Sequence, residues 1–103
     1  MKPPLKESWV KDQIKKILKE YGAVYCMPAT GGFGKSGVSD FLICYKGWFI
    51  SVEAKAGKGT TTALQDKWLE DIHEAGGLCL VVNEDNLGDL RDLLNDISYV
   101  AAM

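Results

Sequence analysis

The 103-residue chain has a single histidine, His73, and no two cysteines in a C-x-x-C arrangement. Zinc sites and histidine-based nucleophile relays need several histidines or cysteines at suitable spacing. The chain is therefore a poor candidate for either chemistry. The three cysteines, Cys26, Cys44 and Cys79, lie in apolar stretches that are typical of strands. We expect them to be buried, reduced thiols in a cytoplasmic protein.

Long apolar segments and nucleotide-binding loops are also missing. No run approaches the roughly 18 apolar residues of a transmembrane helix, and the lysine-rich beginning lacks the hydrophobic region of a signal peptide. The Gly34-Lys35-Ser36 segment does not have the spacing of a Walker A loop. We therefore expect one domain, residues 1–103, with no membrane partner and no nucleotide cofactor.

Acidic and basic residues are unevenly distributed, although the net charge is only −2. Residues 1–59 carry ten lysines against five acidic residues, whereas residues 60–103 carry two basic residues against nine acidic ones. This segregation favours one basic side that contacts nucleic-acid phosphates. Two ordinary solvated faces would give the same pattern.

Hydrophobic periodicity predicts the element order α-β-β-β-α-β-α. The expected helices cover residues 6–21, 62–75 and 87–97, and the expected strands cover 23–28, the two arms of a hairpin within 39–55, and 78–83. In the middle helix, Leu64 and Trp68 lie on the stripe that should face inward. The order predicts an α/β fold with a mixed central sheet flanked by helices.

The hairpin places polar residues at its open end. With a two-residue turn at positions 46–47, Asp40 falls opposite Glu53, and directly opposed Cβ atoms lie about 4.5–5.5 Å apart. Lys55 projects from the same face as Glu53, because side chains alternate along a strand. Two close carboxylates repel each other unless a cation lies between them, and oxygen ligands suit Mg²⁺ or Mn²⁺. The same pattern also arises by chance on strand ends.

Two polar residues on the expected helices point toward this hairpin. Glu7 lies near the apolar stripe of the first helix, although it could simply supply favourable charge in the first helical turn. Gln65 precedes Trp68 by three residues and therefore points toward the sheet. Its alternative role is to bond the loop at the start of its helix.

The chain resembles the PD-(D/E)xK nuclease superfamily, and more closely the small stand-alone VRR-NUC domains of phages, with archaeal-type Holliday-junction resolvases as relatives. The resemblance covers residues 5–83 and rests on Glu7, the run Gly37-Val38-Ser39-Asp40, Glu53-Ala54-Lys55 and residues 61–68. Ser39 stands where proline is common in that family. The resemblance implies a restriction-endonuclease-like core and a metal-dependent endonuclease for branched DNA such as Holliday junctions, phage- or prophage-encoded and acting in the host cytoplasm.

The resemblance also implies a role for each residue of the hairpin. Asp40 and Glu53 would bind Mg²⁺ or Mn²⁺, with the backbone carbonyl of Ala54 as a further ligand. Lys55 would orient the attacking water or stabilise the developing charge.

The two helical residues receive supporting roles from the same resemblance. Glu7 would be an outer-shell ligand or hold a second metal ion. Gln65 would hydrogen-bond a metal-bound water, Lys55 or a phosphate. Symmetric cleavage of a junction would need a homodimer, and Trp9, Trp48 or residues 100–103 offer apolar surface for its interface.

Lysines of the basic half are expected to contact DNA phosphates, namely Lys11, Lys15, Lys35, Lys46 and Lys58. No helix is rich enough in arginine, asparagine or glutamine to read the major groove, which favours structure-specific over sequence-specific cleavage. Tyr25, Phe33 and Trp48 could stack on an unpaired base, although core packing is the alternative role for each.

Two alternatives stay open. The first is a non-catalytic nucleic-acid-binding module with the same fold, against which the intact Asp40, Glu53 and Lys55 set argues. The second is a nuclease that acts on RNA or on plain duplex DNA.

Overall fold

The structure is a computed structural model, and it describes residues 6–29 and 34–103, so that Phe33 lies outside the described residues. Its elements are α1 (Glu7–Tyr21), β1 (Val24–Cys26), β2 (Phe41–Tyr45), β3 (Trp48–Ala54), α2 (Ala63–Glu74), β4 (Leu78–Val82) and α3 (Leu87–Ala101). This order confirms the predicted one. α3 extends four residues beyond its expected end at residue 97, and β1 is shorter than the expected range 23–28. Within the described ranges, no helix has the length and apolar character needed to cross a bilayer.

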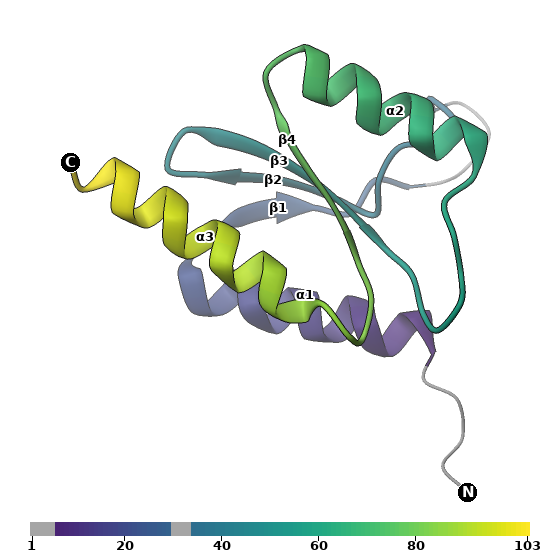
Figure 1. Cartoon of the computed structure of the whole chain (residues 1–103), viewed down its shortest axis with the longest axis horizontal. Coiled ribbons are helices and arrows are strands. Elements are labelled where there is room, and N and C mark those ends of the chain that lie inside the picture. The colour runs from purple at the N-terminus through teal and green to yellow at the C-terminus, as the bar shows by residue number, and fades with distance from the viewer. Residues whose placement is uncertain (1–5, 30–33) are drawn as a thin grey trace, which may run out of the picture.

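The strands form one mixed sheet in the order β1-β2-β3-β4. The β1–β2 and β2–β3 pairs are antiparallel, and β3 and β4 run parallel, joined through α2. Figure 1 shows α1 and α3 together on one face of the sheet and α2 on the other. An α/β class with a mixed sheet between helices is therefore confirmed.

The main core lies between the sheet and the α1–α3 layer. It contains fully or almost fully buried side chains from both layers: Val10, Ile14, Ile17 and Leu18 of α1, Phe41, Ile43, Ile50 and Val52 of the sheet, and Leu90, Leu94 and Ile97 of α3. Burying one such side chain stabilises the fold by about 1.5–3 kcal/mol. This packing fixes α1 against the sheet, and with it every side chain that α1 directs toward the hairpin.

The β2–β3 hairpin has the predicted register. Tyr45 pairs with Trp48 across a two-residue turn at Lys46 and Gly47, whose φ angles of 49° and 84° are both positive. Such turns match the twist of the strands that they connect. The pairing continues without a bulge to the start of β2, so Asp40 reaches the end of β3.

α2 packs over β3 and β4. Trp68 Nε1 donates a hydrogen bond to Ser51 Oγ of β3 at 2.9 Å. Cys79 Sγ of β4 donates to the carbonyl of Leu69 at 3.3 Å. These two contacts fix the position of α2 on the half of the sheet that carries Glu53.

The other half of that face is exposed, which corrects two predictions. Cys26 and Cys44 are exposed rather than buried, because they lie on the face of β1 and β2 that α2 does not reach. Their neighbour Val24 is 74% exposed. Leu64 is also exposed rather than inward-facing, although the next residue of α2, Gln65, contacts the sheet.

Candidate active site

Asp40 and Glu53 meet at the open end of the hairpin. Asp40 Oδ2 accepts a hydrogen bond from the backbone N–H of Ala54 at 2.8 Å, which holds this carboxylate against the end of β3. Glu53, the penultimate residue of β3, is only 3% exposed. The fold thus places two carboxylates side by side, and one of them is almost completely buried.

The two oxygens of Glu53 have different surroundings. Oε1 accepts a hydrogen bond from Gln65 Nε2 at 3.1 Å, and Lys55 Nζ lies 3.9 Å from it. Oε2 is buried without a hydrogen-bond partner among the described residues. An ionised carboxylate oxygen without a donor or cation would be costly here, so Glu53 favours either a proton, which it can share with the Asp40 carboxyl, or a bound cation.

This environment changes the acidity of Glu53. Burial, followed by the interaction with the Asp40 carboxyl, raises the pKa of Glu53 to about 8; Lys55 opposes the shift and Glu7 adds to it. Neutral pH therefore leaves Glu53 largely protonated in the metal-free protein. A bound cation would favour the ionised form, as any opposite charge at this distance does.

A second buried polar atom without a partner belongs to the residue that precedes Asp40. The hydroxyl of Ser39, next to Asp40, shares this property with Glu53 Oε2, and no other side-chain atom in the described residues does. In the described ranges, no group of three or more histidine, cysteine or acidic side chains is placed so that it could hold a metal ion together. Two carboxylates, a carbonyl and water fit Mg²⁺ or Mn²⁺, which are commonly held by one or two carboxylates and complete their shell with water and phosphate.

Lys11 lies between Glu7 and this carboxylate pair. Its Nζ atom is 3.6 Å from Glu7 Oε2 and 3.4 Å from Asp40 Oδ1. Burial opposes the charged form, but the two carboxylates outweigh it and raise the pKa of Lys11 above its ordinary value. The sequence analysis expected Lys11 to contact DNA phosphates and did not predict its contact with Asp40. The only sequence signal for this environment is the i,i+4 spacing of Lys11 from Glu7.

Lys11→Met should strengthen Mn²⁺ binding. The ammonium now engages an oxygen of Asp40 that a metal ion would use, and two like charges at about 4 Å repel by on the order of a few kcal/mol at an effective dielectric constant near 20. We expect the Mn²⁺ dissociation constant to fall about tenfold, measured by isothermal titration calorimetry. Lys15→Met, on the same helix, is the matched control. Unchanged or weaker binding by Lys11→Met would show that the ammonium does not compete for Asp40.

Gln65 has the helix-start role expected as its alternative, and it also makes a contact with Glu53 that was not predicted. Its Oε1 accepts from the backbone N–H of Thr62 at 2.9 Å, while Thr62 Oγ1 accepts from the N–H of Gln65 at 3.2 Å. This capping box begins α2. The remaining amide group, Nε2, donates to Glu53. Helix capping therefore positions the donor that orients the buried carboxylate.

Substituting Gln65 should separate these roles. Gln65→Glu preserves the cap, because Glu serves equally well at this position of a capping box, but replaces the donor to Glu53 with another carboxylate. We expect near-normal helix content by circular dichroism and at least about a tenfold loss of metal affinity or cleavage. Gln65→Ala, which loses both functions, should also lower thermal stability. Equal metal binding by wild type and Gln65→Glu would reduce Gln65 to a cap.

The position of Lys55 is fixed by the pairing of its backbone with β4 and by the loop that follows it. Its side chain is 14% exposed, and its backbone N–H donates to the carbonyl of Val82 at 2.9 Å. The loop that follows is fixed by Glu84, whose two carboxylate oxygens accept from the N–H of Gly57 at 2.8 and 3.1 Å. Glu84 has no sequence motif that points to this role, because the contact joins residues far apart in the chain.

The remaining lysines expected at DNA lie at different distances from the carboxylates. Lys15 follows Lys11 by one helical turn, and Lys35 and Lys58 are exposed on loops. Lys46 occupies the hairpin turn, at the opposite end of β2 from Asp40. Six residues of strand at about 3.3 Å each separate them by about 20 Å. The structure therefore brings Lys11, and not Lys46, to the carboxylate pair.

No family model matches this chain, and no curated protein is similar enough to it to count as a relative. Inferences about function therefore depend on the chain's own residues. The most informative are the paired carboxylates of Asp40 and Glu53 and the cations next to them, Lys11 and Lys55.

Proposed function

We propose that this protein is a Mg²⁺- or Mn²⁺-dependent endonuclease that hydrolyses phosphodiester bonds in branched DNA. The observation that carries the proposal is the buried Glu53 carboxyl group beside Asp40, with Lys55 close by and with one oxygen that receives no hydrogen bond from a donor among the described residues. A purely structural acid at 3% exposure would be expected to have both oxygens satisfied. The element order agrees with that of a PD-(D/E)xK nuclease core.

The chain's residues have complementary tasks in such a reaction. A bound metal ion would supply Lewis-acid charge and lower the pKa of a coordinated water. Asp40 and Glu53 would hold that ion, with the carbonyl of Ala54, and Gln65 keeps Glu53 in its orientation. Lys55, at the edge of the pair, would position the attacking water and stabilise negative charge on the phosphate oxygens.

Lys11 and Glu7 connect the site to its substrate. When the ion is bound, the ammonium of Lys11 would be released from Asp40 toward a DNA phosphate, while Glu7 keeps it within reach. Glu7 is 43% exposed and touches Lys11 rather than the carboxylate pair. It would therefore act as an outer-shell group.

A homodimer is part of this proposal, since one small active site must act on two strands of a branched molecule. Apolar side chains that an interface could bury are exposed in the described structure. Trp48 is 39% exposed, Val100 51% and Met103 89%, and Val24 adds to the uncovered face of β1 and β2.

The proposal is tested by a cleavage assay with Mg²⁺ or Mn²⁺ on four-way junctions, flaps, splayed arms, duplex, single strands and matched RNA. We expect cleavage of branched DNA in preference to duplex, and complete inhibition by EDTA. Binding without cleavage under all these conditions would favour a non-catalytic module. Preferential cleavage of RNA or of linear duplex would replace the substrate class, and full activity in EDTA would contradict the metal mechanism.

A further inference from the structure

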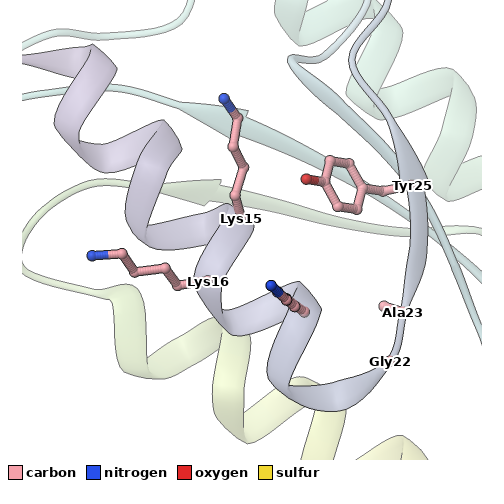
Figure 2. A pocket seen from close by; sticks show the side chains of 6 residues that line it. Lys15, Lys16, Gly22, Ala23 and Tyr25 are labelled. Carbon is pink, nitrogen blue, oxygen red and sulfur yellow. The ribbon is translucent and has the colours of Figure 1, made fainter.

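A basic groove lies between α1 and the edge strand β1, one helical turn beyond Lys11. It has a volume of about 420 Å³ and is lined by Lys15, Lys16, Lys19, Gly22, Ala23 and Tyr25. In Figure 2, Lys15 extends from α1 and the ring of Tyr25 extends from β1 into the same opening. Its size is within the range of about 300–1,000 Å³ that accommodates small organic groups.

We propose that this groove binds an unpaired nucleic-acid strand next to the cleavage position. The inference rests on the proposed endonuclease function and adds to it the class of substrate, a duplex that continues into a single-stranded segment. The lysines of the groove would bind the phosphates of this strand, and Tyr25 would stack on the flat face of an unstacked base.

The lysines of α1 form a row that begins at the carboxylate site. Lys11, Lys15 and Lys19 follow one another at i,i+4 spacing, on one side of the helix and about 6 Å apart along its axis. Lys11 contacts Asp40, whereas Lys15 and Lys19 line the groove. A strand with one phosphate at the carboxylate pair can thus place its next phosphates along α1.

These lysines have little competing charge. Lys15 makes only an exposed pair with Asp12 at 3.7 Å, and such surface pairs are weak. In the part of the chain that the structure describes, Lys16 and Lys19 have no carboxylate within 4.0 Å. Their charges are therefore available to phosphates.

Tyr25 distinguishes an unpaired strand from a duplex. Its ring packs against Phe41, with 5.7 Å between the ring centroids, which limits its motion. A ring held at the side of a groove can stack on a base only if that base has left the helical stack, because a duplex keeps its base faces covered. Stacking of this kind tolerates any sequence, since every base has a flat face.

Fluorescence anisotropy in EDTA tests this groove with a short labelled oligothymidylate, an oligouridylate of equal length and a hairpin duplex. Lys16→Met and Lys19→Met together should weaken single-strand binding about tenfold, and each should reduce the slope of log K against log salt by about 0.7. Tyr25→Leu should weaken single-strand binding about fivefold or more without changing the salt slope. Tyr25→Trp should keep the wild-type affinity, because it still offers a flat ring. The tighter of the two oligonucleotides identifies the preferred polymer.

Lys67→Met, on α2 at the other face of the sheet, is the matched control. It removes the same charge and should change neither the affinity nor the slope by a comparable amount. Equal losses for Lys67→Met and Lys16→Met would overturn the proposal, and so would full single-strand affinity in folded Tyr25→Leu. Because these measurements need no metal, they remain decisive even if no substrate is cleaved, so failure of the groove and failure of the endonuclease are separately visible.

Discussion

Asp40→Asn, Glu53→Gln and Lys55→Ala are each expected to reduce cleavage of branched DNA by about a hundredfold or more, in line with the loss of one strong charge-stabilising group at an active site. Asp40→Asn keeps an oxygen that can accept the hydrogen bond from Ala54, so the end of the hairpin should stay in place. The first two substitutions also remove a carboxylate that we propose binds the metal ion, and Mn²⁺ affinity should fall with activity. Single-turnover cleavage rates at saturating Mn²⁺ measure the effect.

The control for these variants is Asp92→Asn, an exposed carboxylate on α3. It changes the net charge as Asp40→Asn does and should leave cleavage within about twofold of wild type, as expected for an exposed surface position. Circular dichroism must show that all variants are folded. If folded Asp40→Asn cleaves at the wild-type rate, the paired carboxylates are not the reaction centre.

The hairpin could be predicted from the sequence because its determinants are local. A Lys-Gly turn between alternating apolar stretches sets the register, and the register alone brings Asp40 to Glu53. The same holds for Gln65, since helical spacing from Trp68 directs it to the sheet and Thr62 marks the start of the helix. These inferences need no knowledge of how the layers pack.

The environment of Lys11 could not be predicted in this way. Helical spacing shows that Lys11 neighbours Glu7, but its contact with Asp40 depends on where the end of α1 lies over the sheet. Glu84 poses the same problem, because it reaches Gly57 only through the packing of β4 beside β3. Both contacts are properties of the assembled layers.

The exposure of the cysteines follows from the area that α2 covers. Period-two alternation in β2 places Ile43 and Cys44 on opposite faces, but it does not say whether the second face is covered. α2 packs over β3 and β4 only, which leaves Cys26 and Cys44 exposed and Cys79 partly covered. An apolar sequence context favours burial of a cysteine, but in this sheet the area that α2 covers decides how far each cysteine is buried.

The metal-free protein is expected to lose stability as the pH rises from about 5 to 9, chiefly through Glu53. An unfolded glutamate has a pKa near 4.5, and burial with the Asp40 interaction raises that of Glu53 in the fold to about 8. Between these values the native state keeps a proton that the unfolded state has released. Stability from this group is therefore complete below the unfolded pKa and declines as the pH approaches and passes the native one.

Thermal unfolding followed by circular dichroism measures this decline. A loss of a few kcal/mol in a domain of this size lowers the melting temperature by about 10 °C or more. Glu53→Gln, which cannot ionise, should remove most of the pH dependence and melt higher than wild type at pH 9, while Asp92→Asn should keep the wild-type profile.

Adding Mn²⁺ at high pH should restore the lost stability of the wild type, because the ion binds the native state and stabilises the ionised carboxylate. Glu53→Gln should gain much less from the ion, since it has lost one of the two carboxylates proposed to bind it. Parallel pH profiles for wild type and Glu53→Gln would show that burial does not hold a proton on Glu53. Equal stabilisation of both proteins by Mn²⁺ would place the metal ion elsewhere on the molecule.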